Sequence, residues 1–232
     1  MIEEAPALTV HRGFERPDKG LVERLRGAQT GHVVDAMNGR GAIASTVAPV
    51  RGANPDTVAF AGPAVTARAG PDDNLAVFGA IDLAEPGDVI AVTTEGWAAS
   101  ALVGDMVTGM IRNRGCAALV TDGMVRDVAG VLATGLPVFC RGMTPNSPAR
   151  NGPGIVGKQI SLGGVPVHAG DVVVGDRDGV VVVPRDELAV VVEKLDQIVE
   201  LETAMEKRVR EGLELPQFYR ELVDAGAVEY QD

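Results

Sequence analysis

Hydrophobic positions in the first two thirds of the chain follow two alternating patterns. Apolar residues at helical spacing predict helices over 18–40, 73–84, 105–114 and 128–133. Short apolar runs bounded by Gly, Pro or Asp predict buried strands over 58–69, 89–92, 117–120 and 137–140. Strands and helices that alternate in this way are typical of a mainly parallel sheet with crossover helices.

The pattern also predicts one helix cap and one inward-facing helix surface. Thr30 is expected to cap a second helix within residues 18–40. In the helix that begins near residue 105, the apolar positions expected to face the interior are Met106, Val107, Met110 and Ile111.

The last third of the chain has a different pattern. Four short apolar runs, joined by turns rich in Gly and Asp, predict β-hairpins over 160–162, 165–167, 172–174 and 180–183. Pro184 then opens a long helix that extends to about Glu211. Because no repeat or linker is visible, we expect residues 1–232 to form a single α/β domain with a second β layer and a long C-terminal helix.

Composition and charge exclude several classes of partner. The chain has 21 Lys plus Arg against 32 Asp plus Glu, a net charge of −11, so nucleic acid and anionic membranes are not expected partners. The N-terminal residues have neither the basic nor the apolar region of a signal peptide, and no apolar run is long enough to cross a membrane. We therefore expect a cytoplasmic protein. An acidic chain remains compatible with a divalent cation or with a basic partner.

One glycine-rich segment resembles a phosphate-binding motif, but we do not expect it to bind a nucleotide. Residues 152–158 fit both G-x-x-x-x-G-K and G-x-G-x-x-G. A P-loop needs Ser or Thr after the lysine, but Gln159 stands there, and the sequence that follows does not predict the helix that both motifs require.

Two segments concentrate residue types that carry chemistry. Gly104 and Asp105 stand at the start of a predicted helix, and the loop 122–127 follows a buried strand at the sheet edge where α/β proteins bind ligands. A helix N-terminus receives carboxylates, and Arg126 would add a bidentate cationic clamp. Asp122 and Asp127 supply hard oxygen ligands suited to Mg²⁺ or Mn²⁺. The alternative is that Asp105 only caps its helix while Arg126 and Asp127 pair on a surface loop.

The spacing of these residues resembles a known family. Asp105, twenty intervening residues and Arg126-Asp127 form the pattern D-x20-R-D, extended by Gly104 and Asp122-Gly123. This pattern resembles the signature of the RraA-like / 4-hydroxy-4-methyl-2-oxoglutarate aldolase family of class II pyruvate aldolases. Further segments that resemble the family bring the similarity to about residues 20–212; they are 62–66, 86–89, 137–139 and 163–180.

The resemblance implies a fold, an assembly and a site. The fold would be a swivelling β/β/α domain in homotrimers or homohexamers, with active sites between subunits. Arg126 would hold the pyruvate carboxylate, together with backbone amides after Gly104, near Met106 and Val107. Asp127 would bind the divalent metal, and Asp105 would orient a water that delivers a proton to the enolate. The resemblance also implies a Glu from the C-terminal helix of a neighbouring subunit in the outer coordination sphere of the metal.

Glu202 is the candidate for that Glu. On a helical wheel it falls near the middle of an arc formed by Val191, Leu195, Ile198, Val199 and Val209. A carboxylate on an apolar face is costly unless it is paired or bound. The alternative is that the helix leaves the core before this point and Glu202 is solvated. Glu206 is a second candidate.

These observations lead to two functional hypotheses. The first is a divalent-metal-dependent aldolase that cleaves a 4-hydroxy-2-oxo acid to pyruvate and also decarboxylates oxaloacetate. The chain has only four lysines, none on a predicted buried strand, which disfavours a Schiff-base aldolase. The second is a non-catalytic protein that binds and regulates a ribonuclease, as some members of the family do. Loops outside the motif, such as 73–74 and 141–150, are expected to build the distal end of the substrate pocket.

Overall fold

The computed structural model describes residues 6–231, and within them the strands form three sheets. The largest sheet consists of β1 (Leu8–Val10), β10 (Gly154–Val156), β3 (Phe60–Arg68), β4 (Val89–Thr93), β6 (Ala118–Thr121), β8 (Val138–Cys140) and β2 (Ala48–Pro49), with β13 (Val172–Gly175) and β14 (Val180–Val183) branching from β3. The two smaller sheets are the hairpin β11 (Ile160–Leu162) with β12 (Val165–Val167), and the set β5 (Ala101–Val103), β7 (Met124–Val125) and β9 (Gly142–Met143).

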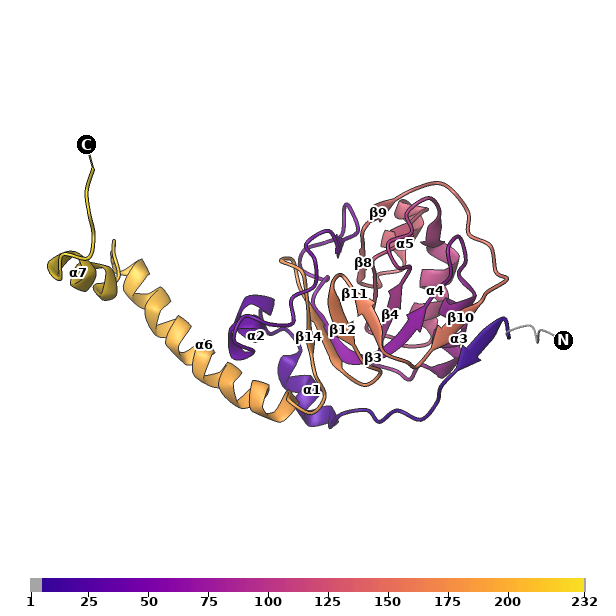
Figure 1. Ribbon diagram of the computed structural model, residues 1–232, viewed down its shortest axis with the longest axis horizontal. Coiled ribbons are helices and arrows are strands. Elements are labelled where there is room, and N and C mark those ends of the chain that lie inside the picture. Colours follow the sequence, from indigo (N-terminus) through magenta and orange to yellow (C-terminus); the bar gives the residue numbers. More distant parts are fainter. Residues whose placement is uncertain (1–5, 232) are drawn as a thin grey trace.

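The centre of the large sheet is parallel, as the alternating pattern predicts. Strands β3, β4, β6 and β8 pair in parallel, with Val65 opposite Ile90 and Ile90 opposite Leu119. The connections between them carry α3 (Leu75–Leu83), α4 (Asp105–Asn113) and α5 (Val128–Ala133) (Figure 1). The side chains of β4 and β6 are buried on both faces, which explains their continuous apolar sequence. Because β3, β4, β6 and β8 run parallel, their carboxyl ends all lie at the same edge of the sheet.

The small parallel sheet extends this edge. Strands β5, β7 and β9 each follow one of the parallel strands of the large sheet, and they pair in parallel in the order β5-β7-β9. Gly104 follows directly after β5, and Arg126 follows directly after β7. Since β5 and β7 are neighbours, two segments more than twenty residues apart in sequence leave the sheet side by side.

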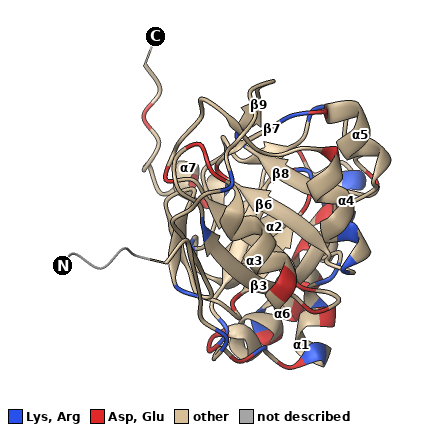
Figure 2. Cartoon of the chain, turned by 90° about the vertical axis from the view of Figure 1, so that its right-hand side faces the viewer, with Lys and Arg blue, Asp and Glu red and all other residues tan. Residues whose placement is uncertain are grey.

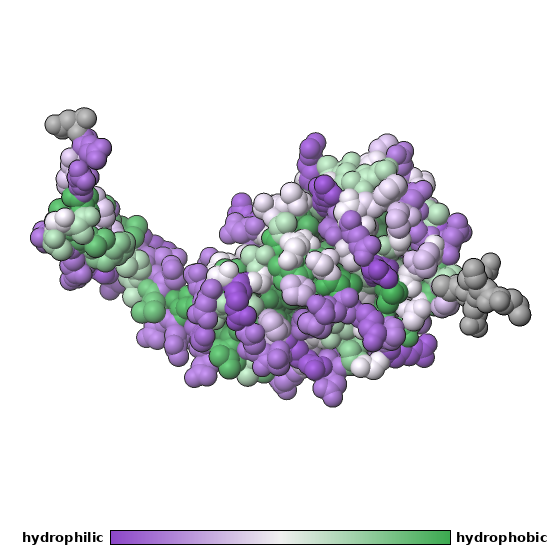
Figure 3. Space-filling view, viewed as in Figure 1, coloured by the Kyte–Doolittle hydropathy of each residue, from purple (hydrophilic) through white to green (hydrophobic). Residues whose placement is uncertain are grey.

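Four helices lie outside the parallel unit: α1 (Lys19–Leu25), α2 (Thr30–Ala36), α6 (Leu188–Arg210) and α7 (Gln217–Asp224). The first half of α6 packs on α2 and buries Leu188, Val191, Val192 and Leu195. Beyond that contact α6 projects from the body and carries α7 at its end (Figure 1). Figure 3 shows hydrophobic surface along this arm, where side chains such as Val199, Leu201 and Phe218 are exposed.

The structure confirms the α/β fold with a long C-terminal helix and corrects several details. Thr30 begins α2 but does not cap it; its backbone N–H and its hydroxyl both donate to the Asp176 carboxylate. In α4, Val107 and Ile111 are buried as expected, but Met106 and Met110 are exposed because that side of the helix faces solvent in the single chain. Helix α7 and the short strands β1, β2, β5, β7, β9 and β10 were not predicted. Within residues 6–231 no helix has both the length and the apolar character needed to cross a membrane.

Candidate functional site

The pairing of β5 with β7 brings the two chemistry-bearing segments together. The Arg126 N–H donates to the Val103 carbonyl (3.0 Å), which holds the end of β7 against the end of β5. Gly104 is the N-cap of α4 and Asp127 is the N-cap of α5, so two helix N-termini begin at the same place. In Figure 2 a basic and an acidic position adjoin at the start of α5. The spacing of twenty residues between Asp105 and Arg126 thus corresponds to one complete crossover from β5 to β7.

Glycine at position 104 allows a close approach of Arg126 and Asp127. A Cβ atom built on Gly104 would lie 2.5 Å from Asp127 Oδ2 and 3.1 Å from Arg126 Cγ. The backbone of Gly104 is extended, so the requirement for glycine comes from these contacts and not from its dihedral angles.

Arg126 and Asp127 form an oriented pair. Arg126 Nε lies 3.2 Å from Asp127 Oδ2, and Arg126 Nη1 donates to the Ser147 hydroxyl (2.5 Å). Asp127 adopts a left-handed backbone conformation (φ 54°, ψ 44°), which non-glycine residues seldom adopt outside functional or tightly constrained positions. Both side chains remain partly exposed and available to a ligand.

Asp105 is held on the other helix. Its Oδ1 accepts the Met106 N–H (2.7 Å), and its carboxylate packs against Gly130 of α5, where a Cβ atom would lie 2.5 Å from Asp105 Oδ2. In the described part of the chain the Val107 N–H has no acceptor, as is usual in the first turn of a helix. The first turn of α4 thus offers a free backbone donor beside a fixed carboxylate.

These groups surround a hollow of about 100 Å³. Its lining is contributed by the start of α3, the β5–α4 junction, the β7–α5 junction and the loop before β10, and comprises Asn74, Val103, Gly104, Asp105, Met106, Val107, Arg126, Asp127, Pro148 and Arg150. The volume is well below the 300–1,000 Å³ of sites for drug-sized ligands, so the hollow suits a small molecule. A larger hollow of about 490 Å³ next to Asp176 and Arg177 lacks such a convergence of helix N-termini and charged pairs.

Asn74 lines this hollow and has an unused acceptor atom. It is 2% exposed, and its Nδ2 donates to the Leu102 carbonyl (3.0 Å). Its Oδ1 is buried and has no hydrogen-bond partner among residues 6–231. A buried carbonyl oxygen without a partner is rare, and here its residue lines the same small hollow as Arg126. Asn74, Ser147 and Arg150 come from the two loops that the sequence indicates for the distal pocket, although the sequence did not indicate a particular role for Ser147.

Asp122 lies apart from this group. Its carboxylate accepts hydrogen bonds from the Thr93 hydroxyl (2.7 Å), the Thr94 N–H (2.7 Å) and the Thr94 hydroxyl (3.2 Å), and it does not line the hollow. These bonds join the end of β4 to the loop after β6. Asp122 therefore supports the loop in the single chain, and its expected role as a metal ligand stays a prediction.

Glu202 lies on the exposed half of α6, where every side chain from residue 201 to 210 is exposed. In the single chain it is solvated, which is the alternative that the sequence left open. Within the described residues it forms no ion pair, whereas Glu206 pairs with Arg210 (3.0 Å). A role of Glu202 at the site of a neighbouring subunit stays a prediction.

Comparisons with known proteins identify several relatives of this chain. The model of the RraA-like family, described as Aldolase/RraA, matches residues 30–182. A Halalkalibacterium halodurans protein, provisionally named a 4-hydroxy-4-methyl-2-oxoglutarate aldolase, is 37% identical over 174 residues, which are 75% of this chain and 81% of that protein.

Two solved structures with sequence similarity have the same fold. Streptomyces coelicolor RraAS2, described as an unusual member of the RNase ES inhibitor RraA family, has a TM-score of 0.72 at 28% identity over 83% of this chain and 100% of its own. The RNA-processing inhibitor RraA from Thermus thermophilis has a TM-score of 0.61 at 26% identity over 68% of this chain and 93% of its own.

Proposed function

The chain belongs to the RraA-like (Aldolase/RraA) family, and we propose that it is a metal-dependent lyase that cleaves a 4-hydroxy-2-oxo acid to pyruvate. The observation that carries this proposal is the convergence of Arg126, Asp127 and Asp105 on one small hollow at two helix N-termini. A cation, a free amide and two carboxylates match the needs of a small anionic substrate whose reaction develops negative charge. The same site would decarboxylate oxaloacetate, because both reactions produce the enolate of pyruvate.

The donor set fits a hard divalent cation such as Mg²⁺ or Mn²⁺. Within residues 6–231 no three His, Cys, Asp or Glu side chains converge as a complete metal cage. Mg²⁺ commonly uses only one or two carboxylates and completes its coordination with water and substrate. Asp127, with its carboxylate at the hollow, is the residue that would hold the ion. When bound, the ion would act as a Lewis acid toward the negative charge that develops on the substrate's keto oxygen.

The protein groups have separate tasks in this proposal. Arg126 binds the carboxylate of the 2-oxo acid, and Ser147 and Asp127 fix the orientation of its guanidinium. The free Val107 amide adds a second donor to the same carboxylate. Asp105, immobilised by the Met106 amide and by Gly130, holds the water that returns a proton to the methylene carbon of the enolate.

The projecting arm supports a further proposal, that the protein is a homotrimer or homohexamer. Of the exposed large hydrophobic side chains, most lie on α6 or beyond it: Val190, Val199, Leu201, Met205, Val209, Leu215, Phe218, Leu222 and Tyr230. An arm with this much exposed apolar surface indicates an interface. In such an assembly Glu202 of a neighbouring subunit would stand near the metal, and the unpaired state of Glu202 favours it over Glu206.

A second candidate function is the regulation of a ribonuclease through protein binding. It is supported by the likeness to a protein described as the RNA-processing inhibitor RraA and to an unusual member of the RNase ES inhibitor RraA family. The net charge of −11 would favour a partner with a basic surface.

One experiment separates the two candidates. The purified protein is incubated with oxaloacetate or 4-hydroxy-4-methyl-2-oxoglutarate and Mg²⁺ or Mn²⁺, and pyruvate is measured with lactate dehydrogenase and NADH. We expect pyruvate well above the background of metal alone. Release no faster than that background with both substrates would contradict the enzyme proposal. Inhibition of a ribonuclease by the same preparation would then support the second candidate.

A further inference from the structure

Arg150 is a second cation at the same hollow, and it has no ion-pair partner among the described residues. It lines the hollow together with Arg126, but it is exposed and forms neither an ion pair nor a side-chain hydrogen bond within residues 6–231. Arg126, in contrast, already contacts Asp127 and Ser147. The hollow thus presents one cation that is partly neutralised and one that is unpaired.

The backbone around Arg150 is held on both sides by buried Asp73. One Asp73 oxygen, Oδ2, accepts the N–H groups of Asn151 (2.5 Å) and Gly152 (2.9 Å), and Oδ1 accepts the Leu75 N–H (2.8 Å). On the other side of Arg150, Ala149 forms a β-bridge with Asp73. Asp73 is only 5% exposed, so these bonds to its carboxylate are shielded from water.

This anchorage connects the Arg150 loop to the floor of the site. The Asn74 N–H donates to the Ala149 carbonyl (3.1 Å), and the Ala149 N–H donates to the Asp72 carbonyl (2.6 Å). Asn74 itself lines the hollow. The residues that flank Arg150 are therefore fixed relative to the site, although its side chain is exposed. A charged side chain on a fixed backbone, without a partner among residues 6–231, is arranged to meet a ligand.

We propose that Arg150, positioned by Asp73, binds the second carboxylate of a dicarboxylic 4-hydroxy-2-oxo acid and makes the site selective for dicarboxylates. The inference rests on the proposed function, in which Arg126 takes the carboxylate next to the keto group. In the reaction the C3–C4 bond breaks and the C4 hydroxyl loses its proton. C4 becomes the carbonyl carbon of one product, and the bond electrons form the pyruvate enolate, which then takes up a proton. A carboxylate on C4 keeps its charge when the bond breaks and remains on the carbonyl product. Arg150 can therefore bind this carboxylate throughout the reaction without opposing bond cleavage.

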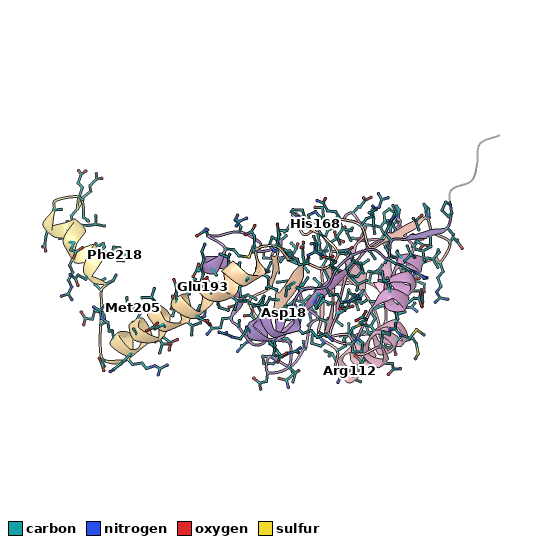
Figure 4. All side chains as sticks on the ribbon, turned by 90° about the horizontal axis from the view of Figure 1, so that it is seen from below. Asp18, Arg112, His168, Glu193, Met205 and Phe218 are labelled. Atoms are coloured by element: carbon teal, nitrogen blue, oxygen red, sulfur yellow. The ribbon has the colours of Figure 1, made fainter. Side chains whose placement is uncertain are left out.

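Kinetics with two substrates test the role of Arg150. The dicarboxylate is 4-hydroxy-4-methyl-2-oxoglutarate, and the monocarboxylate with the same reacting unit is 4-hydroxy-2-oxopentanoate. For Arg150→Ala we expect kcat/KM to fall roughly 10- to 100-fold for the dicarboxylate, mainly through KM, and to change less than about threefold for the monocarboxylate. The matched control is Arg112→Ala, which removes an exposed charge from the far end of α4 (Figure 4). It should leave kcat/KM for both substrates unchanged.

Asp73→Asn tests the positioning role. This variant should lower the preference for the dicarboxylate in the same direction as Arg150→Ala. In the Arg150→Ala background it should have no further effect on the ratio of the two substrates. If Asp73 had a merely structural role, Asp73→Asn would lower kcat/KM for both substrates by the same factor and leave their ratio unchanged.

The outcomes distinguish this inference from the proposed function. If wild type cleaves both substrates, and Arg150→Ala lowers kcat/KM for neither substrate or for both equally, the inference is overturned while the proposed function stands. If wild type releases no pyruvate from either substrate, the proposed function fails. Binding of 2-oxoglutarate and 2-oxopentanoate by calorimetry with Mg²⁺ then decides the inference. Tighter binding of 2-oxoglutarate to wild type, lost in Arg150→Ala, would support it, and equal or absent binding of the two acids would overturn it.

Discussion

Gly104 and Asp127 lie so close together that a Cβ atom on Gly104 would be 2.5 Å from Asp127 Oδ2. This contact joins the N-cap of α4 to the N-cap of α5 and sets the distance between the two halves of the site. The same glycine also borders the Arg126 side chain. One methyl group at this position should therefore disturb the cation and the proposed metal-binding carboxylate together.

Gly104→Ala should lower the kcat of pyruvate release by at least about tenfold, because Asp127 and Arg126 must shift by several tenths of an ångström or more. The matched control is Gly109→Ala in α4, where an added Cβ would meet nothing within 4 Å. Gly109→Ala should keep activity and raise stability by about 0.5–1 kcal/mol, because Ala is favoured over Gly in a helix. Kinetics and urea unfolding of both variants check this expectation, and equal activity in the two would contradict it.

Arg16→Met should destabilise the fold by leaving a buried carboxylate without its cation. Arg16 Nη2 lies 2.7 Å from Asp88 Oδ2, and the Asp88 side chain is only 2% exposed. The hydrogen bond to Asp88, together with its charge, raises the pKa of Arg16. We expect a loss of about 2–4 kcal/mol in urea unfolding; the lower end allows for the Arg16 side chain being 23% exposed. Arg40→Met removes the exposed pair with Glu187 and serves as control, with little expected change. Similar losses in both variants would contradict the distinction.

The two cysteines should be unreactive in the folded protein. Burial raises the pKa of the Cys116 and Cys140 thiols from 9.0 to about 11. At pH 8 Ellman's reagent should modify them far more slowly than in guanidinium, where both are exposed. Since unfolded thiols ionise near pH 9, the free energy of unfolding should fall as the pH rises from 9 toward 11. Rapid modification of either thiol in the native protein would contradict this.

The sequence was sufficient to predict the parallel core and the contribution of the two motif segments to one site, but not the pairing of β5 with β7 that brings these segments together. Apolar runs such as 117–120 mark strands buried on both faces, and the twenty-residue spacing between Asp105 and Arg126 matches one crossover. The outward position of Met106 and Met110 could not be predicted, because apolar spacing on a helix does not distinguish the core from a surface left open in the single chain.

The sequence indicated the loops 73–74 and 141–150, but the contacts that bring their residues to the site are tertiary and have no local signal. Asn74 and Ser147 reach the site only because the loop at 147–152 folds back on residues 72–75. The structural role of Asp122 depends in the same way on Thr93 and Thr94 of the neighbouring strand. Helix α7 has an amphipathic sequence, but it lies on the projecting arm (Figure 4) and is too short for its pattern alone to predict a helix.

The most direct test of the proposed function is metal-dependent release of pyruvate from 4-hydroxy-4-methyl-2-oxoglutarate by wild type, Arg126→Ala and Asp127→Asn. We expect turnover by wild type with Mg²⁺, loss of turnover in EDTA, and recovery when Mg²⁺ is restored. Each variant should be at least about 100-fold slower, since Arg126 binds the substrate carboxylate and Asp127 would hold the ion. Undiminished pyruvate release in EDTA, wild-type rates in either variant, or no release by wild type would contradict it.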